Sequence, residues 1–336
     1  MRDDNNLIEI DDLHTFFYTD VGTVHAVDGV SFDIPRGKTV GVVGESGCGK
    51  SVTSLSLMRI LQEPQGQITG GQIRFNRQKT GQPLDLTKAP VKLMEAIRGG
   101  EISMIFQEPM TALNPVFTIG RQLDEVTKLH NKSITKKKDI MRRSIEMLEL
   151  VGIANAMGVY KMYPHELSGG MRQRTIIAMA LACDPQLIIA DEPTTALDVT
   201  IQAQILDLLR NLKDKLNASI MFITHDLGVV AEMADYVVVM YAGRIVEQGT
   251  AKDIFLNPAH PYTIGLMKSR PNMLEEGERL YSIPGNVPNP INLPNYCYFR
   301  NRCEKRKDVC AGEYPCLLSL SPTHKVACHL YNGREE

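Results

Sequence analysis

The 336-residue chain lacks any long hydrophobic run and any strong excess of charge of one sign. No stretch of about 18 apolar residues occurs, so the sequence predicts no helix that crosses a bilayer. Lysine and arginine total 37 against 39 aspartate and glutamate residues, and this balance argues against a nucleic-acid-binding protein, which favours a basic surface. We therefore expect no nucleic acid among the partners, and we expect any contact with a membrane to come through another protein.

The first residues lack the features of an export signal. Residues 1–6 are polar and acidic, whereas a signal peptide begins with a basic segment that an apolar stretch follows. We therefore expect the protein in the cytosol. Cysteine is also scarce before the tail: five of the seven cysteines lie in the last forty residues. In a reducing compartment such a cluster favours metal ligands over disulfides.

The most specific motif is the octapeptide 44–51, Gly-Glu-Ser-Gly-Cys-Gly-Lys-Ser, which matches the phosphate-binding loop pattern G-x-x-x-x-G-K-[ST]. Residues 39–43 before it predict a short buried strand, and residues 51–61 after it predict a helix. The glycines allow a tight turn whose N–H groups point at phosphate oxygens, and the helix N-terminus adds its dipole. Lys50 supplies a charge for the β- and γ-phosphates, and Ser51 supplies a hydroxyl for Mg²⁺. The sequence therefore predicts a nucleotide site.

Strand and helix patterns alternate over most of the chain. Residues 7–34 predict a β-hairpin with a turn at 20–22. Further strands are expected at 67–75, 102–106, 187–190, 219–224 and 236–240, and helices at 119–166, 171–182 and 201–216. Such an order is typical of an α/β sheet protein.

The composition changes near residue 257. Seven prolines fall between Pro258 and Pro294, and the cysteines follow. We expect this tail to be a separate, loop-rich module that does not continue the sheet, buries little core and needs a metal to hold it together.

Five further motifs follow the phosphate-binding loop in a fixed order. They are Gln107, residues 167–173 (Leu-Ser-Gly-Gly-Met-Arg-Gln), residues 187–192 ending in Asp-Glu, residues 196–198 (Ala-Leu-Asp) and residues 223–226 (Ile-Thr-His-Asp). With the loop they resemble the motifs of the ATP-binding cassette (ABC) ATPases: the coupling glutamine, the signature motif, the second nucleotide motif, the dimer-contact loop and the switch histidine. The resemblance covers residues 7–255 and implies ATP with Mg²⁺ as the nucleotide.

The resemblance implies catalytic roles for Glu192, His225, Gln107 and Lys50. Phosphoryl transfer depends mostly on positioning and charge stabilisation. Glu192 can activate the attacking water as a general base, and Asp191 can hold the Mg²⁺ shell. His225 can bridge the γ-phosphate and the groups that position water. Gln107 can reach metal or water.

The adenine needs an aromatic platform. Phe17 lies 33 residues before Lys50, where the family usually keeps a stacking aromatic, and Tyr18 is the alternative. The expected ATP- and Mg²⁺-binding residues are therefore Phe17, Tyr18, Gly44, Ser46, Gly47, Cys48, Gly49, Lys50, Ser51, Val52, Gln107 and Asp191.

The signature motif implies a second cassette. Ser168 and the N–H groups of Gly169 and Gly170 form an anion nest at a helix N-terminus, and Gln173 belongs to the same motif. In the family this nest closes over the ATP of the other subunit, and Asp198 belongs to the dimer-contact loop. The chain carries one cassette, so a partner ATPase is implied.

Two segments resemble the peptide-importer branch of the family, namely residues 107–115 (Gln-Glu-Pro-Met-Thr-Ala-Leu-Asn-Pro) and residues 257–263 (Asn-Pro-Ala-His-Pro-Tyr-Thr). The whole chain resembles the first ATPase subunit of dipeptide and oligopeptide importers, and nickel-uptake ATPases are similar. This resemblance implies ATP hydrolysis that energises import of di- or oligopeptides. It also implies a paralogous ATPase subunit, two membrane permease subunits and, indirectly, an external peptide-binding protein. The chain would then lie at the cytoplasmic side of the cell membrane as a peripheral protein.

Four cysteines of the tail, Cys297, Cys303, Cys310 and Cys328, are the expected metal ligands. Four thiolates in a short segment suit either an iron–sulfur cluster or zinc. Arginine and lysine residues between positions 300 and 307 would favour the thiolate form. In the peptide-importer branch this tail can hold a [4Fe–4S] cluster, so the resemblance implies one here.

Alternatives to the cluster remain open. Zn²⁺, with His324 and His329 completing a mixed site, is one, and a tail without metal is another. Cys316 has no place in the family pattern.

We therefore expect an α/β protein built as an ABC-type P-loop ATPase cassette. The cassette spans residues 1–256, with a RecA-like α/β core, an antiparallel β subdomain and a helical subdomain at about 108–182. A small loop-rich metal-binding extension follows over 257–336. A nickel or other small-solute importer is the alternative function. A non-transport ABC ATPase of repair or translation is an alternative from another class, but it would usually bring a coiled coil or a second cassette.

Overall fold

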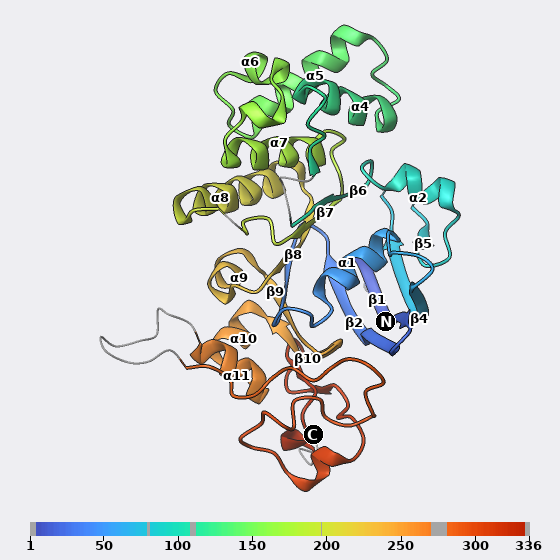
Figure 1. Ribbon diagram of the computed structural model, residues 1–336, viewed down its shortest axis with the longest axis vertical. Helices are drawn as coiled ribbons and strands as arrows, with labels where there is room; N and C mark the ends of the chain where they lie inside the picture. Colours follow the sequence, from blue (N-terminus) through green and yellow to red (C-terminus); the bar gives the residue numbers. More distant parts are fainter. Residues whose placement is uncertain (1–4, 79–80, 108–111, 196, 270–280, 333–336) are drawn as a thin grey trace. The chain divides into compact units, whose positions relative to one another are not determined.

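The computed structural model describes residues 5–78, 81–107, 112–195, 197–269 and 281–332. The chain divides into two compact units, which are described separately. Unit 1 comprises Met1–Lys88 and Phe222–Glu336, and unit 2 comprises Ala89–Met221 (Figure 1). Residues 108–111 of the peptide-importer segment and Ala196 of the dimer-contact motif lie outside the described residues.

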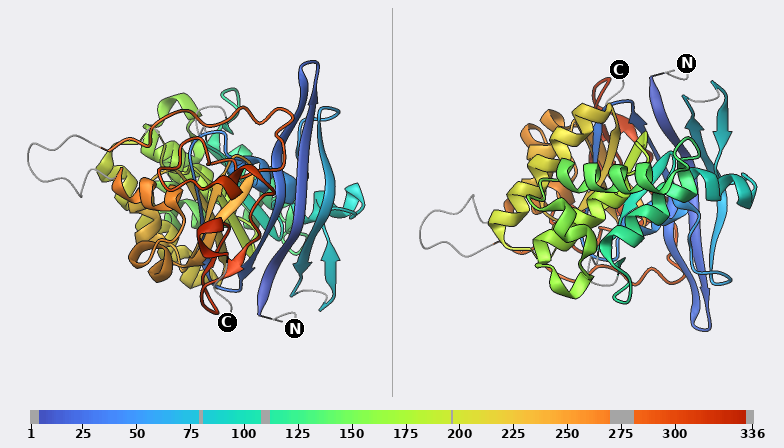
Figure 2. Two further views of the ribbon diagram at one scale, coloured as in Figure 1. Left: turned by 90° about the horizontal axis from the view of Figure 1, so that it is seen from below. Right: turned by 90° about the horizontal axis from the view of Figure 1, so that it is seen from above.

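Unit 1 begins with a four-stranded antiparallel sheet of order β2-β1-β4-β5. The long hairpin of β1 (Asn6–Thr19) and β2 (Gly22–Pro35) is the one that the alternating pattern predicts (Figure 2). β4 (Gly66–Asn76) pairs with β1, and β5 (Pro83–Asp85) pairs with β4. Apolar side chains of both long strands are buried, among them Leu7, Ile8, Val30 and Ile34.

A second group of strands in unit 1 carries the phosphate-binding loop. β3 (Thr39–Val43) is buried along its whole length and pairs in parallel with β9 (Tyr236–Tyr241). β9 turns into the antiparallel β10 (Arg244–Thr250). The connecting helices of this unit are α1 (Lys50–Met58), α9 (Leu227–Met233), α10 (Ala251–Leu256) and α11 (Pro261–Lys268). β8 (Ser219–Thr224) belongs to both units, because unit 2 ends at Met221 and unit 1 resumes at Phe222.

The tail does continue the sheet, contrary to the sequence-based expectation. β12 (Lys325–Val326) pairs with β10 and with β11 (Leu318–Ser319), both antiparallel. An edge strand such as β10 exposes a row of unpaired N–H and C=O groups, and a short extended segment can satisfy them even when its own sequence is too short to signal a strand. Besides α11, the described residues of the tail also form two 3₁₀ turns, η3 (Asp308–Ala311) and η4 (His329–Tyr331).

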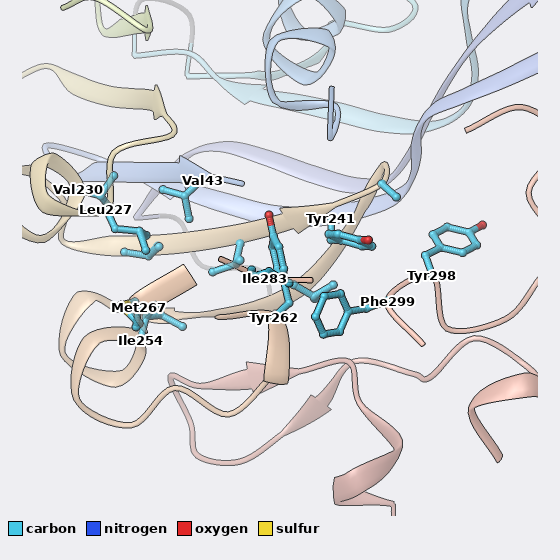
Figure 3. Packing of buried hydrophobic residues seen from close by; sticks show 14 of the residues in the cluster. Val43, Leu227, Val230, Tyr241, Ile254, Tyr262, Met267, Ile283, Tyr298 and Phe299 are labelled. Atoms are coloured by element: carbon cyan, nitrogen blue, oxygen red, sulfur yellow. The ribbon is translucent and has the colours of Figure 1, made fainter. Parts of the chain in front are cut away.

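The tail also buries more core than its composition predicts. Ile283, Tyr298 and Phe299 pack with Tyr241 of β9 and Tyr262 of α11 in one cluster (Figure 3). The ring of Phe299 lies 5.3 Å from that of Tyr241 and 5.4 Å from that of Tyr262. Aromatic side chains bury a large area each, so a few of them compensate for the many prolines.

Unit 2 combines two strands with helices. β6 (Ile102–Ile105) pairs in parallel with β7 (Leu187–Asp191), and both are mostly buried. The expected helical stretch 119–166 is divided into α4 (Ile119–His130), α5 (Lys137–Leu150), α6 (Ala156–Lys161) and η1 (Pro164–Glu166). The described residues of unit 2 also form α2 (Val91–Ile97), α7 (Gly169–Leu181) and α8 (Val199–Leu216). Within the described residues, no helix is both long and apolar enough to span a membrane.

Candidate nucleotide site

The phosphate-binding loop joins β3 to α1 in unit 1, as the sequence predicts. Two of its glycines are required by close packing. A Cβ on Gly44 would lie 2.2 Å from the carbonyl oxygen of Met240, and a Cβ on Gly49 would lie 2.2 Å from that of Ala26. Both residues also have positive φ, which disfavours other residue types. The loop backbone is thus pressed against neighbouring strands, while Ser46 and Gly47 at its top are exposed.

Lys50 begins α1 and is folded back into the loop. Its side chain is buried, and Nζ donates to the carbonyl oxygens of Gly44 at 2.8 Å and Glu45 at 3.1 Å. Cys48 lies beneath, with Sγ 3.8 Å from Nζ, and burial raises the pKa of this thiol. Ser51 and Val52 follow in the first turn of α1 and are half-buried. The ammonium group of Lys50 is thus held against the backbone of the phosphate-binding loop.

The aromatic candidates lie on neighbouring positions of β1. Phe17 pairs with Val24 of β2 and Gly66 of β4, and a Cβ on Gly66 would come within 2.7 Å of the Phe17 ring. Tyr18 is 46% exposed. Successive side chains of a strand point to opposite sides of the sheet, so only one of Phe17 and Tyr18 can point toward a bound adenine. The choice between them stays a prediction.

Unit 2 brings Gln107 and Glu192 together. Glu192 Oε2 accepts a hydrogen bond from Gln107 Nε2 at 3.0 Å and another from Thr195 Oγ1 at 3.0 Å. Glu192 has a φ of 47°, a left-handed conformation that costs a non-glycine residue energy and often occurs at functional sites. Asp191, the last residue of β7, is buried. Thr195 is a contact that the sequence analysis missed.

The signature residues lie at the start of α7. Ser168 is its N-cap, with Oγ accepting from the N–H of Met171 at 3.4 Å, and Gly169 is exposed with open space around it. Gly170 lies close to Ile201 of α8, since an added Cβ would be 3.1 Å from its side chain. Gln173 is buried and donates to the carbonyl oxygen of Pro193 at 2.5 Å, so within unit 2 its amide supports the segment after Glu192.

Two further candidate residues, Asp198 and His225, lie at or just before the N-cap of a helix. Asp198 caps α8, with Oδ1 accepting from the N–H of Ile201 at 2.9 Å. His225 is exposed at the end of β8, directly before Asp226, which caps α9. Both side chains lie at the surface of their own unit.

Three of the tail cysteines raise the pKa of the fourth, Cys297. Cys297 and Cys328 are buried, Cys303 and Cys310 half-buried, and Cys316 exposed; all seven cysteines are free thiols. Burial raises the pKa of Cys297 to about 11, and Cys303, Cys310 and Cys328 each add to the shift. Nevertheless, no three or more His, Cys, Asp or Glu side chains among the described residues are grouped so that they could hold a metal ion. The structure therefore does not show the expected metal-binding module.

The two tail histidines have other partners. His324 Nε2 lies 2.8 Å from Oε1 of the fully buried Glu247, and His329 Nε2 lies 3.0 Å from the carbonyl oxygen of Glu313. The mixed zinc site suggested from the sequence therefore receives no support from these side chains.

Comparison with known proteins defines the family. Residues 27–195 match the model of the ABC transporter family. The chain belongs to the ABC transporter family. Residues 246–310 match a second model, the C-terminal region of oligopeptide/dipeptide transporters.

Curated relatives of this ABC protein match it over nearly the whole length. It is 51% identical to the oligopeptide transport ATP-binding protein AppD of Bacillus subtilis, over 97% of each chain. It is 50% identical to the dipeptide transport ATP-binding protein DppD of the same organism, over 98% of this chain and 96% of that one. A dimeric bacterial ABC transporter cassette superposes with a TM-score of 0.63 at 23% identity, over 73% of this chain and 98% of the other. The ABC cassette fold and its α/β character are thereby confirmed, and the protein is an ABC ATPase. Its family implies membrane permease partners and an ATPase partner.

Proposed function

We propose that this ABC ATPase binds and hydrolyses ATP to energise the import of di- or oligopeptides. The observation that carries the proposal is similarity at about 50% identity to peptide-transport ATP-binding proteins over nearly the full chain. The match includes the tail, which corresponds to the oligopeptide/dipeptide transporter C-terminal model over residues 246–310. We propose the expected division into a cassette at 1–256, with its helical subdomain at about 108–182, and an extension at 257–336.

The site residues receive the following roles in this proposal. Lys50 and the loop 44–51 bind the phosphates, Ser51 and Asp191 hold Mg²⁺, and Phe17 or Tyr18 stacks on adenine. Glu192 is the general base, and its hydrogen bonds to Gln107 and Thr195 support this role because they orient the carboxylate. His225 acts at the γ-phosphate.

A second, paralogous ATPase subunit completes the site. Ser168, Gly169, Gly170 and Gln173 then face the ATP of that partner, and Asp198 lies at the contact between the subunits. The exposure of Gly169 and the N-cap position of Ser168 support this assignment, since free N–H groups at a helix start attract anions. Two permease subunits hold the pair at the cytoplasmic side of the membrane, and an external binding protein delivers peptide.

The function is tested by transport. The full importer is reconstituted in vesicles with its binding protein outside and ATP inside, and uptake of labelled di- and oligopeptides is compared with uptake of Ni²⁺. We expect peptide uptake that stops when Glu192 is replaced by glutamine. Uptake of nickel without peptide uptake would assign the protein to the nickel importers instead.

We also propose that Cys297, Cys303, Cys310 and Cys328 hold one metal centre, a [4Fe–4S] cluster, with Zn²⁺ as the alternative. The donor chemistry supports this: the thiols of Cys303, Cys310 and Cys328, all from one short segment, each raise the pKa of Cys297, whereas Cys316 is exposed. When bound, the metal would crosslink the tail and contribute folding energy.

The metal proposal is tested on protein purified without oxygen. We expect a brown protein with about four irons per chain, as a [4Fe–4S] site requires. Cys310→Ser should lose the colour, and the matched variant Cys316→Ser should keep it. A colourless protein with one zinc per chain would reject the cluster, and a chain that binds neither metal would reject the centre.

A further inference from the structure

Arg302 in the tail forms a partly buried ion pair with Glu45 of the phosphate-binding loop. Its Nη1 donates to Glu45 Oε2 at 2.6 Å, and its Nη2 donates to Glu45 Oε1 at 2.9 Å. Two parallel bonds of this kind are the strongest arrangement that an arginine and a carboxylate can form. The side chain of Arg302 is 5% exposed and that of Glu45 28%, so water screens the pair only weakly. The partners are 257 positions apart in sequence, and both belong to unit 1.

The guanidinium is fixed from its other side by the tail itself. Nε donates to the carbonyl oxygen of Pro284 at 3.1 Å, and Nη2 donates to that of Ile283 at 3.2 Å. Nη1 also donates to the hydroxyl of Tyr241 at 3.4 Å. Arg302 therefore presents its charge to Glu45 in one orientation that depends on the docked tail.

A second contact holds the backbone of the same loop residue. The N–H of Glu45 donates to the hydroxyl of Tyr262 at 2.8 Å. Tyr262 lies on α11 and packs against both Tyr241 and Phe299 (Figure 3). Both the backbone and the carboxylate of Glu45 are thus held by residues that lie far beyond the loop in sequence.

A third contact joins the tail to the hairpin that carries the adenine candidates. The N–H of His25 donates to the carbonyl oxygen of Pro290 at 3.1 Å, and the N–H of Asn292 donates to that of Thr23 at 2.9 Å. Val24, between Thr23 and His25, pairs with Phe17 across the hairpin. The tail therefore contacts both the β-strand that faces Phe17 and the phosphate-binding loop.

The charge of Glu45 gives the ion pair a consequence for ligand binding. Glu45 directly follows Gly44 in the loop that, in the proposed function, receives the phosphates of ATP. An uncompensated carboxylate beside bound phosphates would weaken binding, because like charges placed together repel strongly in a partly buried site. Lys50 contacts the backbone carbonyl of Glu45, whereas Arg302 pairs with its carboxylate.

We propose that Arg302 is a positioning residue of the ATP site, which neutralises Glu45 and holds the phosphate-binding loop ready for ATP. The affinity for ATP then depends on a docked tail. This inference rests on the proposed placement of the ATP phosphates at residues 44–51.

The test is titration calorimetry of the full-length protein with ATP. Arg302→Met should weaken ATP binding about 30-fold, which corresponds to about 2 kcal/mol, because it leaves the Glu45 carboxylate unpaired. Adding Glu45→Gln to Arg302→Met should restore the affinity to within about 3-fold of wild type, since the repelling charge is then gone. Arg300→Met is the matched control in the same segment: Arg300 lies over the ring of Tyr296, 4.2 Å from its centre, and should leave affinity unchanged. In the assembled transporter, Arg302→Met should raise KM for ATP and change kcat much less.

Arg302→Lys keeps the proposal testable if the methionine variant does not fold. Lysine retains the charge but cannot form the two parallel bonds, so its affinity should lie within about 5-fold of wild type. Wild-type affinity in a folded Arg302→Met, or a double variant as weak as Arg302→Met, would overturn the proposal. If both variants fold, an ATP affinity of Arg302→Lys as low as that of Arg302→Met would also overturn it. If Arg302→Met does not fold, the proposal is overturned when Arg302→Lys loses far more than 5-fold in ATP affinity. Lys50→Ala distinguishes the placement of the ATP phosphates at residues 44–51 from the positioning role of Arg302. If Lys50→Ala binds ATP normally, the placement of the phosphates is wrong, regardless of the result for the Arg302 variants.

Discussion

Acid should destabilise the folded protein through one buried histidine of the tail. His260 caps α11, and its Nδ1 accepts a hydrogen bond from the N–H of Tyr262 at 3.0 Å. Burial lowers the pKa of His260 from 6.5 to about 4, although the nearby Glu247 opposes the shift. The folded protein therefore holds this imidazole neutral, whereas the unfolded chain takes up a proton near pH 6.5.

The sign and size of the effect follow from these two pKa values. A lowered pKa in the folded state contributes stability that is fully present above pH 6.5 and is lost as the pH falls towards 4. One pKa unit corresponds to about 1.4 kcal/mol, so the full effect is roughly 3 kcal/mol. Between pH 7 and pH 5 the folded state should lose about 2 kcal/mol through His260 alone.

The assay compares wild type with His260→Asn, which keeps a side-chain acceptor at the cap but does not titrate. Urea unfolding is followed by circular dichroism at several pH values, since the chain has no tryptophan. The wild type should lose about 2 kcal/mol more than the variant between pH 7 and pH 5. His165→Asn, at an exposed histidine, is the control and should follow the wild type. Parallel pH profiles for wild type and His260→Asn would refute the reasoning.

Two further predictions concern ATP turnover. Replacing Glu192 by glutamine in the assembled transporter should leave ATP binding intact, while the rate of hydrolysis falls by roughly 10²–10⁴-fold, the usual contribution of a general base. Normal turnover by Glu192→Gln would show that Glu192 is not the general base. Lys50→Ala should weaken nucleotide binding itself. The chain alone should be a poor ATPase, because its bound ATP lacks the anion nest that Ser168 and its neighbours would form in a second subunit. Mixing the chain with the paralogous and membrane subunits should restore turnover. High ATPase activity of a strictly monomeric sample would contradict this prediction.

The cassette could be predicted because its signals are local. The loop 44–51 has its strand directly before it and its helix directly after it, so the motif and its context lie within some twenty residues. The buried strands 102–106 and 187–190 were likewise placed correctly from short apolar runs, as β6 and β7. Glu192 and Gln107 were found by motif order, although their hydrogen bond spans 85 positions.

The tail shows where such reasoning fails. β12 is two residues long and is a strand only because β10 offers an unpaired edge, so no pattern in its own sequence could reveal it. The Arg302–Glu45 pair has no local signal either, since one partner looked like part of a basic cluster and the other like a variable loop position. Cysteine spacing predicted that four thiols would gather, and it could not show whether their geometry suits a metal.

The distance along the chain between Glu45 and Arg302 has a consequence for biosynthesis. A ribosome adds roughly 5–20 residues per second, so Arg302 is made roughly 10–50 s after the phosphate-binding loop. Once residue 226 has been added, the nascent polypeptide contains every ATPase motif, but it lacks the arginine that pairs with Glu45 until residue 302 is made. If Arg302 supports the ATP site as proposed, a chain whose synthesis stops between residues 226 and 302 should bind ATP more weakly than the finished protein.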